Sequence, residues 1–366
     1  MILLGSTGSI GCSAIEVAQQ LNIPIQTLVA GKNIDLLNQQ IKQLQPRFVA
    51  IADQKDIDKL NPCGAKVFWG QEGMIEAISA SDSSLVLNAL VGFAGLEPTL
   101  HAISLGKRVA LANKESLVSG GWLIDTQAII PVDSEHFSLW HLCQNHPFKQ
   151  LYITASGGAF RDTPIQHIPT QNAQNALKHP NWKMGQKITI DSASMANKLF
   201  ELLEGAYLFH TPHIDALIER QSLIHAMVAF CDGSISLHLA KPDMKLALSY
   251  ALDPLQAAQR SFIPTLDLQD CPSFRFETID PQRYPLWQLK THLLAQPKLG
   301  IILNASNEVA VDGFLQGKYN FGKMLDLVLL AFNRFDTLPS LASIQEIKEF
   351  DQEIRLYTRS AIATHT

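Results

Sequence analysis

Charge is scarce in this chain of 366 residues. Only 17% of the residues are Asp, Glu, Lys or Arg, against about 25% in an average soluble protein. The formal net charge is −5, which is too small to favour a nucleic-acid or anionic-membrane partner through bulk charge. Apolar residues make up 46% of the chain. The composition therefore excludes intrinsic disorder and allows a large core.

Cysteine is also rare. The five cysteines are odd in number and far apart, and no Cys-x-x-Cys pair offers a zinc or redox motif. Spacing of this kind argues against a disulfide framework. We expect reduced thiols and a cytoplasmic protein.

Long apolar runs are absent as well. The longest apolar stretch, Leu85 to Leu96, is interrupted by Asn88 and two glycines and is shorter than the ~20 residues that span a bilayer. The segment from Met1 to Gly5 has no basic region ahead of an apolar one, so it is interpreted as a strand and not as a signal peptide. We expect no membrane partner.

What the first third does contain is a regular alternation of short apolar runs and helix-period segments. Such alternation is typical of a parallel sheet with helices on both faces. The sequence therefore predicts an α/β protein with an N-terminal Rossmann-like domain over residues 1–120. The predicted strands are Ile2–Leu4, Ile25–Ala30, Phe48–Ala52, Ala65–Trp69, Leu85–Leu90 and Arg108–Ala112.

The pattern changes after residue 120. Longer polar segments separate the apolar runs, which predicts a central α+β domain over residues 121–252. A proline-rich connector follows over 253–285, and helix-period residues then predict a C-terminal helical bundle over 286–366. The strands expected here are Ile129–Val132, Leu151–Ala155, Lys187–Ile190, Leu223–Phe230 and Ser234–Leu239. The expected helices are Leu286–Ala295, Ser306–Leu315, Lys323–Phe335 and Ser343–Ile354.

A glycine-rich segment, Gly5-Ser-Thr-Gly-Ser-Ile-Gly11, follows the first predicted strand and opens a helix. Glycines allow a tight turn and a close backbone approach to a pyrophosphate at the positive end of the helix. The spacing is Gly-x-x-Gly-x-x-Gly and not the Gly-x-Gly-x-x-Gly of many NAD sites. Its place at the start of a βαβ unit favours a dinucleotide site over a plain tight connection.

The end of the second strand indicates which dinucleotide. NAD sites place an Asp or Glu ~20 residues beyond the glycines, where it binds the ribose 2′-hydroxyl. Here the strand is followed by Gly31-Lys32-Asn33, with no acid before Asp35. A cation and an amide suit a 2′-phosphate, so the sequence favours NADPH.

Acidic residues gather in two further motifs. Asp133 and Glu135 follow a predicted strand, and in an extended chain residues two apart point the same way. Asn197, Lys198 and Glu201 fall on one face of a predicted helix. Neighbouring carboxylates repel unless a cation neutralises them, and Mg²⁺ or Mn²⁺ accepts such oxygen ligands.

These motifs, taken in order, resemble the 1-deoxy-D-xylulose 5-phosphate reductoisomerase family. The resemblance extends along nearly the whole chain. It is carried by Gly5-Ser-Thr-Gly-Ser-Ile-Gly11, Ala30-Gly-Lys-Asn33, Leu111-Ala-Asn-Lys-Glu-Ser-Leu117, Pro131-Val-Asp-Ser-Glu-His136, Ala155-Ser-Gly-Gly-Ala-Phe-Arg161, His179-Pro-Asn-Trp-Lys-Met-Gly185, Asp191-Ser-Ala-Ser-Met195, Asn197-Lys198, Glu201, Gln221-Ser-Leu-Ile-His225, Pro242-Asp-Met244 and Asn304-Ala-Ser-Asn-Glu308.

The resemblance implies an NADPH- and divalent-metal-dependent oxidoreductase of the non-mevalonate isoprenoid pathway. It would isomerise and reduce 1-deoxy-D-xylulose 5-phosphate to 2-C-methyl-D-erythritol 4-phosphate. The metal would be Mn²⁺ or Mg²⁺, with Co²⁺ as an alternative. The enzyme would act on a phosphorylated sugar as a homodimer, with an NADPH domain, a catalytic domain and a helical domain.

The family's functional residues transfer to this chain motif by motif. The resemblance implies catalysis by Lys114, Asp133, Glu135 and Glu201, the last three of which would hold the metal. Substrate would be bound by Lys114, Ser134, Glu135, Ser156, His179, Ser192, Asn197, Lys198 and Glu201. NADPH would be bound by Thr7, Gly8, Ser9, Ile10, Gly31, Lys32, Asn33, Asn113, Glu115 and Gly185.

One turn departs from the family pattern. Glu219-Arg220 stands where the family usually has His-Pro, ahead of the Gln221-Ser222 pair. On the residues alone, two other interpretations stay open: a simple NADP-dependent dehydrogenase of the homoserine or hydroxyacid type, and a nucleotide-sensing binding protein. A requirement for a divalent metal would distinguish a reductoisomerase from a simple dehydrogenase. Consumption of NADPH with deoxyxylulose phosphate would distinguish it from a binding protein.

Overall fold

The computed structural model describes residues 1–143, 147–182, 184–269, 271 and 273–364. Contacts between Cα atoms divide the chain into two units. The first unit contains Met1–Ser116, Ile124–Phe137 and Asp243–Pro264, and the second contains Leu117–Leu123, Ser138–Pro242 and Thr265–Thr366. Lys183 of the His179–Gly185 motif lies outside the described residues.

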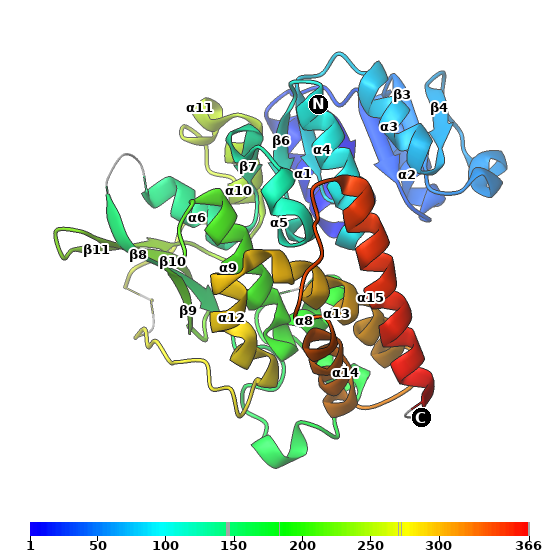
Figure 1. The fold of residues 1–366 in the computed structure, drawn as a ribbon. Helices are drawn as coiled ribbons and strands as arrows, with labels where there is room; N and C mark the ends of the chain where they lie inside the picture. The colour runs from blue at the N-terminus through cyan, green and yellow to red at the C-terminus, as the bar shows by residue number, and fades with distance from the viewer. Residues whose placement is uncertain (144–146, 183, 270, 272, 365–366) are drawn as a thin grey trace. The chain divides into compact units, whose positions relative to one another are not determined.

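A seven-stranded sheet, parallel throughout, forms the centre of the first unit, in the order β4-β3-β2-β1-β5-β6-β7 (Figure 1). The chain passes from β1 outward to β4 and then returns to the other side of β1 with β5. Ligands of such sheets bind where the strand order reverses, beyond the carboxyl ends of the strands. The strands are β1 (Ile2–Leu4), β2 (Thr27–Ala30), β3 (Phe48–Ile51), β4 (Lys66–Trp69), β5 (Leu85–Asn88), β6 (Arg108–Leu111) and β7 (Ile129–Pro131).

Helices cover this sheet because each carries an apolar stripe. On α1 (Ser9–Gln20), Ala14, Val17 and Ala18 are buried in the same core as Leu3 and Leu28. The other main helices between the strands are α2 (Ile34–Leu44), α3 (Gly70–Ala80) and α4 (Leu96–Ser104). The first unit therefore has the Rossmann-like α/β fold that the sequence predicts.

A later segment returns to the first unit. Helix α10 (Lys245–Leu252) packs against α1, where Leu248 is fully buried and Lys245 Nζ lies 2.6 Å from Glu16 Oε2. Residues 243–264 therefore complete a unit that begins more than 240 residues earlier. The division into four domains at residues 120, 252 and 285 stays a prediction.

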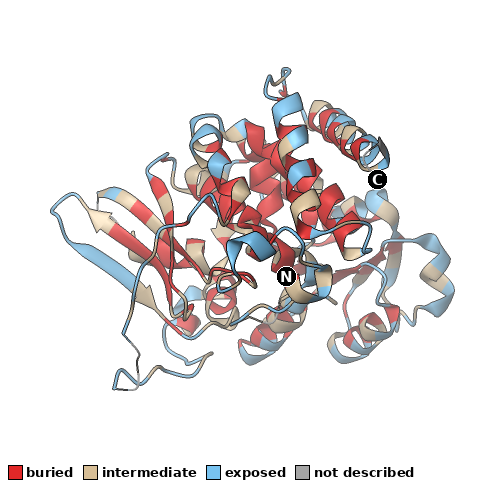
Figure 2. Ribbon diagram, turned by 90° about the horizontal axis from the view of Figure 1, so that it is seen from below, coloured by how far each residue is buried: buried red, intermediate tan, exposed pale blue. Residues whose placement is uncertain are grey.

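The second unit contains a four-stranded sheet in the order β11-β10-β8-β9, in which only β8 and β9 are parallel. The strands are β8 (Phe148–Ala155), β9 (Ile214–Ile218), β10 (Ile224–Phe230) and β11 (Ile235–Leu239). Strand β11 is an edge strand, and its first three residues are exposed (Figure 2).

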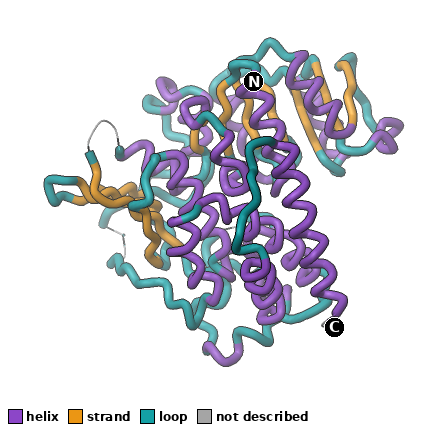
Figure 3. The backbone as a smooth tube through the Cα atoms, in the orientation of Figure 1, coloured by secondary structure: helices purple, strands orange, loops and turns teal. Residues whose placement is uncertain are grey.

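The rest of the second unit consists of helices and of the loops that connect them (Figure 3). The buried centre is α13 (Gly300–Leu315), which packs against α14 (Phe321–Arg334) and α15 (Ile344–Thr364) and also contacts α8 (Gln186–Ser194) and α9 (Ala196–Leu208). The short α12 (Lys290–Ala295) packs on α9. Four predicted helical segments therefore lie in helices, although α13 begins earlier and α15 ends later than expected.

The predicted strands are confirmed within a few residues, with one error and one omission. Lys187–Ile190 is not a strand, because it lies within α8. There Lys187 Nζ contacts Asp191 Oδ2 at 2.9 Å, an i, i+4 pair typical of a helix. Strand β9 was not predicted, although its residues alternate between buried and half-buried positions. None of the helices in the described ranges is long and apolar enough to cross a membrane.

Candidate active site

The glycine-rich turn of the first unit connects β1 to α1. Gly5 has φ +83°, and a Cβ there would lie 2.5 Å from the backbone oxygen of Ala89. A Cβ on Gly11 would lie 2.3 Å from the oxygen of Gly5. Gly8 forms the N-cap of α1 without a side-chain hydrogen bond, so the positive end of the helix is presented by backbone alone. Of the predicted NADPH residues here, Gly8 and Ser9 are exposed, and Thr7 and Ile10 are half-buried.

The three residues that follow β2 are all exposed. Apart from Gly31 and its two chain neighbours, no atom of the described residues lies within 4 Å of the position that a Cβ would take on Gly31. The Oδ1 atom of Asn33 accepts a hydrogen bond from the Leu36 backbone N–H at 3.2 Å and caps α2. Lys32 lies between them with an exposed side chain. This segment therefore provides open space at Gly31, a positive charge at Lys32 and the amino end of α2, close to the turn after β1.

Asn113 and Glu115 stand after β6 and are nearly inaccessible to solvent. The Asn113 Nδ2 atom donates to the backbone oxygens of Leu90 and Gly92 at 2.8 and 2.9 Å. The two residues are 1% and 8% exposed. Asn113 therefore fixes the loop after β5, which also contains the close neighbours of Gly5. A direct role of either side chain in NADPH binding stays a prediction.

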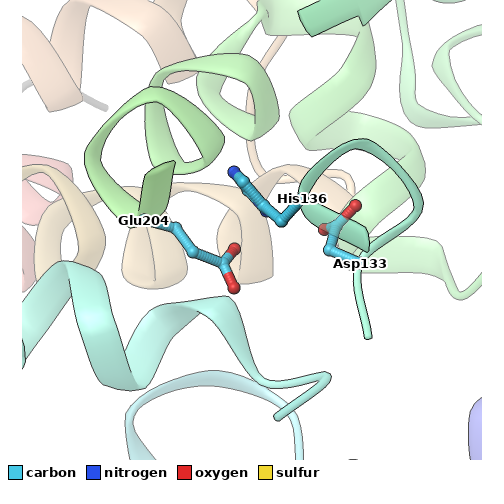
Figure 4. Close-up of side chains that lie close together, drawn as sticks. All are labelled: Asp133, His136 and Glu204. Atoms are coloured by element: carbon cyan, nitrogen blue, oxygen red, sulfur yellow. The ribbon is translucent and has the colours of Figure 1, made fainter. Parts of the chain in front are cut away.

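Lys114 and Asp133 form a buried ion pair in the first unit. Lys114 begins α5 (Lys114–Gly120), and its Nζ contacts Asp133 Oδ2. Burial alone would raise the pKa of the Asp133 carboxyl, but the Lys114 ammonium and then His136 hold it well below its usual value. Figure 4 shows Asp133 and His136 near the start of α6 (Ser134–Leu142). The structure therefore keeps this predicted metal ligand ionised.

Glu135 corrects one step of the sequence argument. Helix α6 begins at Ser134, so Glu135 lies in its first turn and not in an extended chain. The strand geometry given as the reason is therefore wrong, but the two carboxylates do lie together, with oxygen atoms within 4.8 Å of each other. The Ser134 hydroxyl donates to Glu135 Oε2, and an acid in the first turn is favoured by the helix dipole.

The acidic face of α9 is confirmed in the second unit. Asn197 Nδ2 donates to one oxygen of Glu201, and Lys198 Nζ contacts the other. Lys198 Nζ also donates to the Thr154 backbone oxygen at 2.6 Å, near the end of β8. Glu201 is 1% exposed and Lys198 5%. Figure 4 places Glu204 on the same helix, and it too is buried.

Ser156 and His179 meet where β8 ends. His179 Nε2 lies 2.9 Å from Ser156 Oγ, and the backbone N–H groups of Asn181 and Trp182 donate to His179 Nδ1. Burial lowers the pKa of His179 to about 4, aided by Arg161 and Lys198. The imidazole is therefore neutral at pH 7. Because Nδ1 is an acceptor, Nε2 carries the proton and donates to Ser156.

The glycines after Ser156 bring this loop onto α8. Gly158 has φ +66°, and a Cβ there would lie 2.6 Å from the Ser192 backbone oxygen. The Gly158 N–H donates to Ser156 Oγ at 3.1 Å. Ser192, Ser156, His179 and Lys198 therefore belong to one region of the second unit. Gly185 is the exposed N-cap of α8.

One residue of this region had no role in the sequence interpretation. Arg161 donates through Nη1 to the backbone oxygens of Ser156 and Arg220 at 2.9 and 2.8 Å. Its presence in the Ala155–Arg161 motif was the available signal. Its hydrogen-bond partners could not be predicted, because every residue has a backbone oxygen. Arg161 and Lys198 bring two cationic side chains to the region around Ser156, and cationic donors suit a phosphate.

A parallel sheet of Rossmann type, with a glycine-rich turn after its first strand, places the chain among the α/β enzymes with a nucleotide-binding fold. Models of the 1-deoxy-D-xylulose 5-phosphate reductoisomerase family match residues 1–121, 129–209 and 239–357. These ranges cover most of the sequence. The chain therefore belongs to the 1-deoxy-D-xylulose 5-phosphate reductoisomerase family.

Curated relatives match over nearly their whole length. The reductoisomerase of Wolinella succinogenes is 54% identical over 98% of this chain and 99% of its own. That of Helicobacter pylori strain 26695 is 53% identical over 97% and 98%, and that of Nautilia profundicola 44% over 98% and 99%.

Solved structures agree with the fold over the full chain. A reductoisomerase crystallised with NADPH, fosmidomycin and magnesium is 30% identical, with a TM-score of 0.92 over 99% of this chain and 98% of its own. The Zymomonas mobilis reductoisomerase in complex with NADPH is 32% identical, with a TM-score of 0.88 over the same shares.

Proposed function

We propose that this chain converts 1-deoxy-D-xylulose 5-phosphate and NADPH to 2-C-methyl-D-erythritol 4-phosphate and NADP⁺ with the help of a divalent metal ion. The observation that carries the proposal is the match to the curated reductoisomerase of Wolinella succinogenes, which is 54% identical over 98% of this chain. The Ser156 region of the second unit, with Arg161 and Lys198, would recognise a phosphate, and the glycine-rich turn of the first unit would recognise the dinucleotide.

The residues of the first unit fit NADPH. Gly5 and Gly11 pack their backbones closely within the turn, and the exposed Gly8 leaves the N-cap of a 12-residue helix without a side chain. Thr7, Gly8, Ser9 and Ile10 would bind the pyrophosphate, because backbone N–H groups and a helix dipole favour an anion. When bound, NADPH supplies the hydride. Gly31, Lys32 and Asn33 would surround the 2′-phosphate.

The donor set for the metal consists of three carboxylates. Asp133 and Glu135 belong to the first unit and Glu201 to the second, and we propose that all three bind one Mn²⁺ or Mg²⁺ ion, or Co²⁺ as an alternative. Carboxylate oxygens are the ligands that such hard cations take. When bound, the ion supplies a Lewis acid that polarises a carbonyl and lowers the pKa of a hydroxyl. Lys114 keeps Asp133 ionised, so this ligand needs no deprotonation before the metal arrives.

The substrate phosphate would bind in the second unit. Ser156 Oγ accepts from His179 Nε2–H and from the Gly158 N–H, so its own hydroxyl proton is directed to a further acceptor. Ser192, Asn197 and Lys198 would add donors, and Lys198 a positive charge. Lys114, Ser134, Glu135 and Glu201 would contact the reacting end of the sugar, where Lys114 could move a proton or stabilise developing charge.

The active form is proposed to be a homodimer. Ile235 and Leu237 of the edge strand β11 are 64% and 45% exposed, and an exposed apolar edge strand tends to pair with another chain. A second copy of this chain is the proposed occupant. A monomeric mass in solution, measured by light scattering, would overturn it. The cytoplasm is the proposed location, since the five cysteines are all unbridged.

The experiment that tests the function is an NADPH-oxidation assay. NADPH should be consumed only when 1-deoxy-D-xylulose 5-phosphate is present, activity should be lost with EDTA, and added Mn²⁺ or Mg²⁺ should restore it. Binding of NADPH without consumption would instead indicate a nucleotide-sensing protein. Turnover that survives EDTA would indicate a simple dehydrogenase.

A further inference from the structure

The turn between β9 and β10 is held by a buried carboxylate. Glu219 is fully buried. Its Oε1 accepts from the Gln221 N–H at 2.7 Å, and its Oε2 accepts from the N–H groups of Leu223 and Ile224 at 2.9 and 3.2 Å. Three backbone donors on one carboxylate fix the path of the turn, because each bond to a charged acceptor is stronger than a neutral one.

The turn is also tied to the end of β8. The Glu219 N–H donates to the Ala155 backbone oxygen at 2.9 Å, immediately before Ser156. Ser222 has φ +56°, a left-handed conformation that a non-glycine residue adopts at a cost. The Glu219 carboxylate accepts from the residues on both sides of Ser222 and holds it in that conformation.

The fixed turn presents one backbone oxygen to both loops of the phosphate region. The Arg220 oxygen accepts from Arg161 Nη1 at 2.8 Å and from Asn181 Nδ2 at 2.7 Å. Arg161 Nη1 also donates to the Ser156 backbone oxygen at 2.9 Å. The backbone N–H of Asn181 donates to His179 Nδ1 at 3.1 Å. Asn181 Nδ2 also donates to Ser222 Oγ of the same turn at 2.7 Å. The Ser156 loop and the His179 loop are therefore both anchored on this turn, and they share the Arg220 oxygen.

We propose that Glu219 is a positioning residue for phosphate recognition: by fixing the Arg220 backbone oxygen, it holds Ser156 and His179 at hydrogen-bonding distance. The proposal rests on the proposed function, in which these two side chains bind the substrate phosphate. The Arg220 guanidinium contributes elsewhere, since it contacts Asp162 at 2.8 Å and Glu277 at 3.3 Å. The anchor is therefore the Arg220 backbone oxygen and not its side chain, and Glu219 fixes the position of that oxygen.

Glu219→Gln tests the proposal most directly. An amide keeps the size of the side chain, but it replaces an acceptor with a donor that faces backbone N–H groups. The KM for the phosphorylated sugar should rise about tenfold or more, while the KM for NADPH stays unchanged. Arg220→Ala, which keeps the backbone oxygen, should raise the KM for the sugar less than Glu219→Gln does.

Glu346→Gln is the matched control. Glu346 Oε2 accepts from the N–H groups of Ala342 and Ser343 at 2.7 and 2.9 Å before α15. The same substitution therefore removes the same kind of contact at another turn. It should lower the melting temperature without a change in either KM. An equal KM for the sugar in both variants would overturn the proposal.

A second variant tests the proposal if Glu219→Gln does not fold. Asn181→Ala removes one donor to the Arg220 oxygen from a half-buried loop position. It should raise the KM for the sugar, and in the double variant the two effects should be less than multiplicative, because Asn181 Nδ2 bonds the Arg220 oxygen and Ser222 Oγ of the turn that Glu219 fixes. Normal KM in Asn181→Ala would contradict the shared anchor.

Amide hydrogen exchange tests the positioning without turnover. The N–H groups of Asn181 and Trp182, both bound to His179 Nδ1, should exchange faster in Glu219→Gln and at the wild-type rate in Glu346→Gln. If the wild type fails to turn over the sugar phosphate, the proposed function fails, while this exchange still measures the role of Glu219. Unchanged exchange at both amides would overturn the positioning role.

Discussion

The Nε2 atom of His179 lies 2.9 Å from the Oγ atom of Ser156. Two backbone N–H groups occupy the other ring nitrogen of His179, so the tautomer is determined by the loop itself. The Ser156 hydroxyl receives two donors and can give its own proton to a ligand. A neutral histidine can therefore support anion binding, while the positive charge comes from Lys198 and Arg161.

The first prediction concerns the protonation of His179 in the free enzyme. Its pKa of about 4 lies below the ordinary 6.5 because of burial and the two nearby cations. The unfolded chain therefore binds the proton more readily than the folded chain between these values. Stability from this group is complete above pH 6.5 and is lost as the pH falls from 6.5 towards 4.

Nuclear magnetic resonance titration of the His179 ring checks this prediction. The ring should remain neutral at pH 5.5. Protonation of His179 near pH 6.5 would show that the loop leaves the ring open to water.

The second prediction concerns the choice of cofactor. Lys32→Asp removes a cation beside the proposed 2′-phosphate site and adds the kind of side chain that NAD sites use. Loss of one charge-assisted contact costs on the order of 1.5–3 kcal/mol, so the preference for NADPH over NADH in kcat/KM should fall at least about tenfold. Lys42→Asp, at the other end of α2, is the control for charge alone. Equal use of the two cofactors by the wild type would contradict the assignment.

The third prediction concerns the phosphate end of the substrate. Lys198→Ala should raise the KM for the sugar phosphate, because an ammonium–phosphate contact exists before and during the reaction. Lys187→Ala is the matched control, since Lys187 also pairs with an acid on its own helix at 2.9 Å. A fall in melting temperature with unchanged KM in Lys198→Ala would show that this lysine is only the partner of Glu201.

The fourth prediction concerns the metal ligands. Glu201→Gln should weaken Mn²⁺ binding by at least about tenfold and greatly lower kcat. It should also lower the melting temperature, because the buried Lys198 ammonium loses its carboxylate partner. NADPH binding should be retained. Calorimetry with Mn²⁺ measures the first effect, and Glu353→Gln on the exposed face of α15 is the control. Unchanged Mn²⁺ affinity would remove Glu201 from the set of ligands.

Local patterns predicted the first unit well because its signals are local. The glycines after β1 and the alternation of strands and helices depend on neighbours in sequence, and both are found in the structure. The second unit was harder to predict. Lys187–Ile190 alternates like a strand over four residues, too few to distinguish it from a helix. Helix α13 is buried along almost its entire length, so it has no amphipathic pattern to mark its start.

The sequence named candidate site residues but not their contacts. The family motifs named Ser156, His179 and Lys198, and the face shared by Lys198 and Glu201 followed from helical spacing. Three contacts could not be predicted: the hydrogen bonds that set the His179 tautomer, the Lys114 ion pair that keeps Asp133 ionised, and the three backbone N–H groups that donate to Glu219. Each depends on backbone groups or side chains that only the folded chain brings together.

Analysis of the reaction product tests the central claim most directly. A reductoisomerase rearranges the carbon skeleton before reduction. In its product the methyl group is therefore attached to a carbon that carries no hydrogen. A simple dehydrogenase would reduce the ketone in place and leave one hydrogen on that carbon. The proton magnetic resonance spectrum of the product formed with NADPH and Mn²⁺ should therefore show the methyl group as a singlet. A methyl doublet would contradict the account.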